Sequence, residues 1–488
     1  MRLSLPRRQA ERRSLRLWHV WIVLPLAFVT ALVVAAAVFF AGWDLLGAQA
    51  LKPEHRIDSK TLFDLVKLSF GVVAGAGALV ALVVAYRRQR VDEDGALREA
   101  TRLHTERFTT AVSQLGDDSA AVRLGGVHAL AGLADDAPTR ELRQTCIDVL
   151  CAYLRLPYAA ESELPAGDAN AWHAYLALRE VRHTVIRLIR DHLRLGPEHP
   201  HSWQGHDFDF TGGVFDGGDF ADAEFTGGRV DFNAAEFIGG TVSFVGAKFT
   251  GGTVSFSSAR FTGGTVSFVG AKFTGGTVSF SSARFTGGTV SFSYARFTGG
   301  TVDFDAAEFA DGTVDFAGAK VTGGRVDFNA AEFAGGRFYF TGAKFTGGTV
   351  DFRRAGFTGG RVGFVCAEFT GGTVSFDRVR FTGGTVDFAG AKVTGGRVSF
   401  ISARFTGGTV DFDRVRFIGG TVDFAGAEFT GGTVDFNAAE FADGTADFDL
   451  ARFTGGTVDF SRALGAAPDG LQWSGSPLPV GLSLPSTW

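Results

Sequence analysis

The feature that most constrains the fold of this chain is a 12-residue repeat that runs without a break from residue 225 to residue 460. Two phenylalanine positions and one glycine position recur through 20 consecutive units, and the only departures from Phe are Val321 and Val393. Self-similarity at a fixed short period is typical of solenoids, in which stacked units bury one continuous core. These residues are therefore expected to form stacked β-coils and not an ordinary globular domain.

Each unit supplies two short segments with an alternating pattern. Val254 and Phe256 lie two residues apart, as do Ala259 and Phe261, so each pair points to one face of an extended chain. The residue between them is mostly Ser or Asp in one segment and Lys, Arg or Glu in the other, which suits an outward face. The Gly-Gly pair after Phe261 permits a positive φ and is expected to form a sharp corner. A period of two with regular interruptions excludes a helix.

The length of one coil follows from the space that the side chains need. A 12-residue coil is too small to enclose two Phe, one Val and one Ala in a layer about 4.8 Å thick. A 24-residue coil gives four sides with one Phe on each, and residues 242–265 and 266–289 are identical. The string Asp-Arg-Val-Arg-Phe recurs after 36 residues, at Asp377 and Asp413, which favours a different period. We expect 24 residues per coil and ten coils along a shaft of roughly 48 Å.

The (Ala/Val)-x-Phe segments, together with a spacing of five between Phe210, Phe215, Phe220 and Phe225, resemble the pentapeptide-repeat family. The resemblance implies a right-handed quadrilateral β-helix over residues 207–462. The later units differ from that family because they alternate spacings of five and seven residues. Upstream strings such as ERFTTAVSQL and RQTCIDVLCAYL are similar to membrane-anchored, actinobacterial-type members. That likeness implies the same domain order and no known reaction.

Two uncharged runs near the N-terminus, residues 20–41 and 68–86, are each long enough to cross a hydrocarbon layer of ~30 Å as a helix. Six arginines precede the first run, and Arg87, Arg88 and Arg90 follow the second. The positive-inside rule then places both termini in the cytoplasm and the short loop outside. We therefore expect a multi-pass protein of the cell membrane that contacts the lipid bilayer through two transmembrane helices.

The residues between the second run and the repeat show apolar positions at helical spacing, which predicts a small α-helical segment. Its last helix could cover the first coil, and Trp473 in the C-terminal tail could cover the last one. An end left open would instead allow association of two copies as a homodimer. The chain is accordingly divided into a basic cytoplasmic N-terminus (1–17), a transmembrane helix (18–43), an extracytoplasmic loop (44–67), a second transmembrane helix (68–86), a cytoplasmic α-helical segment (87–206), the solenoid (207–462) and a Pro/Gly/Ser-rich tail (463–488).

No residue is predicted to be catalytic, to bind a cofactor or to hold a metal. Cys146, Cys151 and Cys366 are too few for a disulfide framework and are interpreted as reduced thiols. His199, His201 and His206 gather in one loop, but no cysteine or carboxylate pattern supports a metal site there. The net charge of −5 is small for 488 residues, so a nucleic-acid partner is not indicated, and no small-molecule substrate is expected.

Charge on the outward positions of the repeat is unevenly distributed. With 24 residues per coil, one row of side chains in register would read Lys248, Lys272, Arg296, Lys320 and Lys344. Residues 241–300 hold five basic and no acidic residues, whereas residues 405–460 hold three basic and ten acidic ones. Stacked layers make extended binding surfaces, although such residues also serve simply to keep a Phe-rich core in solution.

The function predicted from these features is that of a membrane-anchored, non-enzymatic scaffold whose shaft binds an unknown cytoplasmic protein. The alternative is a DNA-mimicking inhibitor or protector of a topoisomerase, which the pentapeptide-repeat resemblance implies. The basic stretch 241–300 and the two expected anchors count against that alternative. An enzyme is not expected, because the Gly-Gly pair recurs in almost every unit and is therefore a structural element, not a site.

Overall fold

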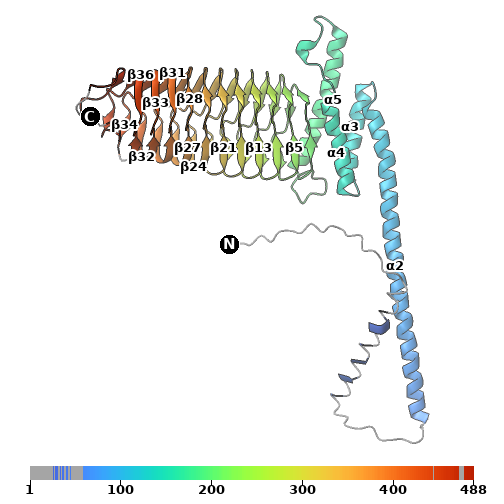
Figure 1. Cartoon of the computed structure of the whole chain (residues 1–488). Coiled ribbons are helices and arrows are strands. Elements are labelled where there is room, and N and C mark those ends of the chain that lie inside the picture. Colours follow the sequence, from blue (N-terminus) through green and yellow to red (C-terminus); the bar gives the residue numbers. More distant parts are fainter. Residues whose placement is uncertain are drawn as a thin grey trace. The chain divides into compact units, whose positions relative to one another are not determined.

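The computed structural model describes residues 59–442, 445–471 and 477–488, together with scattered positions between residues 26 and 44. The chain divides into two compact units, residues 1–103 and residues 104–488. Each unit is described by itself. The second unit contains the repeat, the three helices between residues 120 and 194, and the last turns of a longer helix that begins in the first unit (Figure 1).

The longest helix, α2 (Ser59–Leu115), has 57 residues and contains the predicted second span 68–86. A spanning helix needs about 20 consecutive, predominantly apolar residues. Within the described residues no helix is long and apolar enough to meet that requirement. α2 instead continues from the apolar run, as one helix, into the charged residues that follow Tyr86. The prediction of a multi-pass cell-membrane protein is therefore wrong. The first predicted span, 18–43, lies largely outside the described residues.

Three further helices follow, α3 (Ala120–Asp135), α4 (Arg140–Arg155) and α5 (Ala169–Arg194), with a short 3-10 turn, η1 (Glu161–Glu163), before α5. Thr139 accepts a hydrogen bond from the Leu142 backbone N–H and begins α4, and Asp168 does the same for the first turn of α5. The faces that these helices turn toward each other and toward the first coil are apolar. Their buried side chains include Leu130, Leu150, Leu154, Val185 and Ile189.

The repeat folds as a right-handed β-solenoid of about 11 turns that begins at residue 208. Strands pair in parallel with a register of 24 residues, as in Thr253–Ser255 against Thr277–Ser279. The predicted 24-residue coil is confirmed, with about one coil more than expected. The recurrence of Asp377 as Asp413 after 36 residues is a shift of one and a half coils, which carries the same string from one sheet to the other.

Every coil contributes strands to two parallel sheets. In the described residues the first sheet has 18 strands: β1 (Phe208–Asp209), β4 (Glu224–Phe225), β5 (Arg229–Asp231), β8 (Lys248–Phe249), β9 (Thr253–Ser255), β12 (Lys272–Phe273), β13 (Thr277–Ser279), β16 (Arg296–Phe297), β17 (Thr301–Asp303), β20 (Lys320–Val321), β21 (Arg325–Asp327), β24 (Lys344–Asp351), β27 (Glu368–Ser375), β30 (Lys392–Ser399), β32 (Arg416–Asp423), β34 (Glu440–Phe441), β35 (Thr445–Asp447) and β37 (Leu464–Gly465).

The second sheet has 20 strands over the same described ranges: β2 (Val214–Phe215), β3 (Gly218–Asp219), β6 (Glu236–Phe237), β7 (Thr241–Ser243), β10 (Arg260–Phe261), β11 (Thr265–Ser267), β14 (Arg284–Phe285), β15 (Thr289–Ser291), β18 (Glu308–Phe309), β19 (Thr313–Asp315), β22 (Glu332–Phe333), β23 (Arg337–Tyr339), β25 (Gly356–Phe357), β26 (Arg361–Gly363), β28 (Arg380–Phe381), β29 (Thr385–Asp387), β31 (Arg404–Asp411), β33 (Glu428–Asp435), β36 (Arg452–Asp459) and β38 (Leu482–Ser483). Both sheets run the length of the stack (Figure 1).

The core of the solenoid consists of columns of stacked phenylalanine rings. Phe256 and Phe280, one coil apart, lie 4.7 Å apart with an angle of 4° between their planes. Phe268, from the opposite sheet, meets Phe256 edge-on at 6.0 Å and 87°. Offset stacks and edge-to-face pairs are the arrangements that the ring quadrupole favours. One coil places Phe249, Phe256, Phe261 and Phe268 in four separate columns, and all four rings are buried.

The Gly-Gly pair has the predicted positive φ, which is 67° at Gly264, but the tight turn of the coil lies elsewhere. The chain turns tightly between Phe256 and Ala259, where the Ala259 backbone N–H donates to the Phe256 carbonyl at 3.0 Å and Ser258 has a φ of 58°. At the Gly-Gly pair the chain only bends, and in later coils single strands such as β24 run straight through it. A Cβ on Gly263 would lie 2.5 Å from the carbonyl oxygen of Ile238 in the coil before. Close approach of adjacent coils therefore requires this glycine.

The C-terminal tail closes the far end of the stack. β37 pairs with β34, and β38 pairs with β36, so the tail extends both sheets. The Trp488 ring lies 5.7 Å from those of Phe441 and Phe460, and its indole N–H donates to the Gly465 carbonyl at 3.0 Å. Trp473, which was expected to close this end, lies outside the described residues.

Candidate functional site

A buried carboxylate joins the helices to the first turn of the solenoid. Asp216 lies between β2 and β3 and accepts hydrogen bonds from two tyrosine hydroxyls, Tyr158 at 2.6 Å and Tyr175 at 2.7 Å. Arg179 Nε donates to it at 3.1 Å, and His183 Nε2 lies 3.3 Å from its second oxygen. Tyr175, Arg179 and His183 come from α5, so this one side chain ties the helix to the coil.

Three groups of this cluster have pKa values that lie far from neutral pH. Burial by itself raises the pKa of the Asp216 carboxyl, but hydrogen bonds from His183, Tyr158 and Tyr175 outweigh burial and hold that pKa well below its usual range. Burial and the hydrogen bond to Asp216 raise the pKa of Tyr175 to about 12, and the pKa of Tyr158 is raised for the same reasons. A general acid or base needs a pKa near the working pH, so these three groups suit attachment and not proton transfer.

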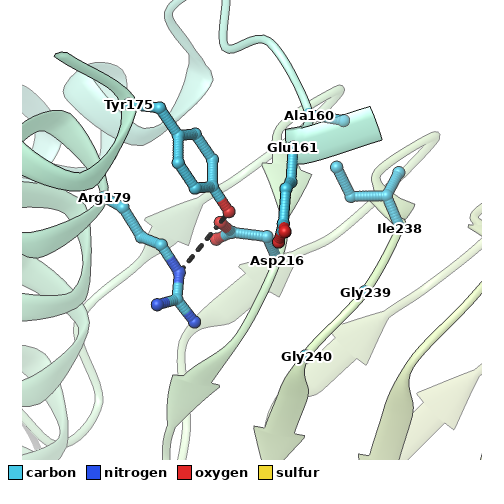
Figure 2. Close-up of a pocket in the computed structure, with 8 residues that line it drawn as sticks. All are labelled: Ala160, Glu161, Tyr175, Arg179, Asp216, Ile238, Gly239 and Gly240. Atoms are coloured by element: carbon cyan, nitrogen blue, oxygen red, sulfur yellow. Dashed lines mark hydrogen bonds and ion pairs between the residues drawn. The ribbon is translucent and has the colours of Figure 1, made fainter. Parts of the chain in front are cut away.

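A cleft of about 450 Å³ opens beside Asp216. Figure 2 shows Tyr175 and Arg179 reaching from the helix toward the carboxylate, with Ile238, Gly239 and Gly240 on the neighbouring coil. The remaining lining residues are Ala160 and Glu161. Asp216 accepts hydrogen bonds from four partners of the helical segment. The cleft therefore lies at the interface between the helical segment and the first coils.

The histidines of the loop after α5 have structural partners. His206 Nδ1 lies 2.9 Å from the Gln144 side-chain oxygen, and burial together with Arg140 and Arg143 lowers the pKa of His206 to about 4. His201 lies 3.7 Å from a carboxylate oxygen of Asp135. Over the described residues, no three or more His, Cys, Asp or Glu side chains gather as metal ligands.

The three cysteines are free thiols. Cys146 and Cys151 are buried, and burial raises the pKa of Cys146 to about 11 and that of Cys151 further. A thiol with a raised pKa is a poor nucleophile, because the thiolate is the reactive form. Cys366 is exposed at a corner of the solenoid.

The basic ladder is the most regular charged feature of the solenoid surface, and its register is confirmed. It consists of Lys248, Lys272, Arg296, Lys320 and Lys344, which pair directly between successive coils of the first sheet. All five side chains are exposed. With coils about 4.8 Å apart, the five charges span roughly 19 Å.

Carboxylates neutralise this ladder only at its two ends. Lys248 pairs with Glu224 at 3.0 Å, and Lys344 pairs with Glu368 at 2.9 Å. Lys272, Arg296 and Lys320 have no carboxylate partner in the part of the chain that the structure describes. Each of these three exposed cations pairs in register with a basic residue on the coil before it and on the coil after it.

An acidic ladder lies on the second sheet toward the C-terminus. Asp387, Asp411, Asp435 and Asp459 pair in register on successive coils. Burial, together with the neighbouring carboxylates of Asp387 and Asp435, raises the pKa of Asp411. The two ladders therefore differ in sign, in sheet and in position along the stack.

Comparison of the chain with protein-family profiles, with curated proteins and with solved structures finds no match. The fold alone defines the class, which is that of β-solenoid repeat proteins. Reasoning from the sequence found the basic ladder through its period but missed Asp216. A single Asp in the string Gly-Val-Phe-Asp-Gly-Gly carries no signal for partners that lie 33 to 58 residues away.

Proposed function

We propose that this chain is a non-enzymatic interaction scaffold of the pentapeptide-repeat type, whose basic ladder binds an acidic segment of a partner protein. The ladder is the observation that carries the proposal. Its three central cations lack carboxylate partners within the described residues, and they are fixed at equal intervals on a rigid stack. A preorganised surface loses little conformational entropy when it binds.

The spacing of the ladder favours a helical partner over an extended one. Side chains on one face of a strand recur about every 6.8 Å, which is wider than the ~4.8 Å between coils. Side chains three and four residues apart on a helix advance about 4.5 and 6 Å along its axis, which brackets the spacing of the coils. A helix of roughly 13 residues has the length of the five-cation ladder. The partner segment is therefore an acidic helix that lies along the solenoid axis.

Assignment to the pentapeptide-repeat type rests on three features of the fold. Except where Val321 and Val393 stand, each coil supplies one ring to each of four columns, and tight turns follow two of those rings. The entry rings Phe210, Phe215 and Phe220 are five residues apart. The non-enzymatic part of the proposal rests on the chemistry of the cleft at Asp216, where the carboxylate and the two tyrosines are held far from neutral pKa values.

The decisive experiment reverses the three central charges in the full chain, as Lys272→Glu, Arg296→Glu and Lys320→Glu together. The probe is a fluorescent 14-residue helical peptide with Glu at every third and fourth position, measured by anisotropy. We expect at least tenfold weaker binding by the variant, and wild-type binding that weakens steeply with salt.

The matched control reverses three cations of the second sheet that already have carboxylate partners, Arg260, Arg284 and Arg404. This control variant should bind the peptide within twofold of wild type. Equal losses in the two triple variants would show that only net charge matters and would remove the ladder as the binding site. A thermal melt of each variant verifies that the solenoid is intact.

The acidic ladder favours a second candidate function, the DNA-mimicking topoisomerase inhibitor. Asp411, Asp435 and Asp459 present a regular row of negative charge on successive coils, whereas Asp387 is buried and pairs with Arg361 at 2.8 Å. The full chain is tested in a gyrase supercoiling assay, with Asp411→Asn and Asp435→Asn as the matched variant. No inhibition at micromolar protein would remove this candidate.

A further inference from the structure

The repeat departs from its own pattern most strongly at one corner. In the coils that contain Phe256, Phe280, Phe304 and Phe328, the second corner residue is small, namely Ser258, Ser282, Ala306 and Ala330. In the next two coils the same position holds Arg354 and Arg378. Both arginine side chains are exposed, so packing of the core does not explain this change.

The two arginines occupy a backbone conformation that does not favour them. Arg354 has a φ of 61° and Arg378 a φ of 57°, in the left-handed region that residues with a Cβ seldom adopt. Both side chains are exposed, so neither gains core packing in return.

Around this corner lies a cleft of about 370 Å³. Four of its seven lining residues are arginines, and the lining consists of Arg325, Asn329, Arg353, Arg354, Asp377, Arg378 and Ile401. The carboxylates within the cluster are Asp327, Asp351 and Asp377, so positive charge is in excess.

Two of the arginines, Arg325 and Arg353, are held in place by the buried carboxylate of Asp351. Asp351, with only 2% of its side chain exposed, accepts from Arg325 Nη2 at 2.9 Å and from Arg353 Nε at 2.8 Å. Asp377 accepts hydrogen bonds at Oδ1 from the Ser399 hydroxyl and from the Ile401 backbone N–H, the latter at 3.1 Å. Among the described residues this leaves Arg354 and Arg378 without a carboxylate partner.

We propose that this corner, the arginine corner, binds a phosphate monoester, which Arg354 and Arg378 clamp from two successive coils. A guanidinium presents a planar fork of donors that matches two oxygens of a phosphate. A phosphate monoester carries close to two negative charges and three strong acceptor oxygens, so it can satisfy both free guanidiniums at once. Arg353, fixed by Asp351, adds a third cation at the edge of the site.

The test exchanges the two free arginines for the residue that other coils carry at the same position, as Arg354→Ser with Arg378→Ser. Because Ser258 adopts a φ of 58° at the equivalent place, this double variant is expected to keep the fold. Binding is measured on the full chain by isothermal titration calorimetry at constant ionic strength in chloride. The probes are inorganic phosphate and a phosphoserine peptide, with the unphosphorylated peptide as the reference.

Wild type should bind at least one phosphate probe saturably, and the double variant should bind it at least tenfold more weakly. Saturation by inorganic phosphate identifies the free ion as sufficient, whereas saturation by the phosphopeptide alone identifies a phosphorylated chain as the source. Arg414→Ser is the matched control, since Arg414 lies at the other corner with a φ of 53° and is 3.5 Å from Asp413. Its binding should equal that of wild type.

Two results would overturn the proposal. One is the absence of saturable binding of either phosphate probe by wild type. The other is equal binding by wild type and the double variant. Reversal of the basic ladder serves as an independent arm, because Lys272, Arg296 and Lys320 are not part of the arginine corner. If the arginine corner alone binds phosphate, the ladder variant keeps its affinity for phosphate even when it loses the acidic helix.

Discussion

The helical segment and the solenoid that it adjoins are built on opposite principles. In the solenoid one contact recurs many times, as in the ring stack between Phe256 and Phe280 at 4.7 Å. In the helical segment the contacts do not recur, and four of its side chains converge on Asp216 of the first coil. The solenoid therefore spreads its stability over equal layers, whereas attachment of the helices depends on a few polar groups. Substitutions in the two regions should therefore differ in how much unfolding free energy they cost and in how far from the substituted residue the effect extends.

The largest effect is expected when a ring is removed from the middle of a column. Phe304 is fully buried and stacks on Phe280 and Phe328, so Phe304→Ala should cost about 4 kcal/mol of unfolding free energy. Because layers contact only their neighbours, the loss should also split the stack into two cooperative blocks. Hydrogen exchange should show the two blocks, and the exposed Thr298→Ala should leave exchange unchanged. If the Phe304 variant still unfolds as a single cooperative unit, stability is not distributed over equal layers that contact only their neighbours.

The next effect concerns two glycines of one coil that have nearly equal φ values. Gly276 has a φ of 67°, and a Cβ there would lie 2.6 Å from the Gly252 carbonyl oxygen. Gly270 has a φ of 66°, and a Cβ there would meet nothing within 4 Å. Gly276→Ala should therefore cost about 3 kcal/mol, and Gly270→Ala about 1 kcal/mol. Urea denaturation measures the unfolding free energy of both variants. Equal losses would show that the positive φ alone sets the cost, and not the contact of the added Cβ with the coil before.

A smaller and more local effect is expected in the helical segment. Asp216→Asn removes the charge that faces Arg179 and His183 and should cost about 2 kcal/mol. The loss should appear as faster hydrogen exchange in α5 and in strands β2 and β3, while strands beyond residue 300 keep their protection. If the whole solenoid exchanges faster, the helices stabilise every layer and the contrast between the two regions fails.

The smallest effect is the pH dependence that His206 adds at the helical segment. His206 has a pKa lowered to about 4 by burial and by Arg140 and Arg143, whereas its ordinary value is 6.5. Between these values the unfolded chain binds the extra proton, so stability is lost as the pH falls from 6.5 toward 4. His206→Gln should flatten this part of the curve in thermal melts between pH 7 and pH 4. An unchanged slope would assign the dependence to other groups.

The sequence predicted the solenoid well because spatial neighbours in a stack lie a constant 24 residues apart. That constancy placed Lys272 beside Lys248 and one Phe on each side of the coil. It could not place the tight turn, since both the Gly-Gly pair and Ser257-Ser258 permit a positive φ. The bend at the Gly-Gly pair needs glycine because Gly263 closely approaches Ile238 of the coil before, whereas the tight turn at Ser257-Ser258 does not need glycine. This difference is visible only in the structure.

The exceptions within the repeat also escaped prediction. Val321 replaces a Phe in the coil where Phe338 replaces a Val, and both side chains are buried. Phe338 meets Phe309 edge-on at 5.2 Å and 74°. The two changes nearly conserve the volume of that layer, but the pairing is visible only once the coil is closed. The contacts of Asp216 could not be predicted either. Its partners lie at unequal separations along the sequence, so no repeat period indicates them.

Closure of the last coil by Trp488 has a consequence for how the molecule is made. Each coil is templated by the coil before it, so the stack can grow in the order in which the chain is synthesised, beginning against the helices. Such growth has no internal limit, because the top of every layer offers the same unpaired strands to the next. A second chain could supply that next layer and begin a fibre. Trp488 and the tail strands β37 and β38 cover the last rings and strands of the stack, where such a layer would have to add.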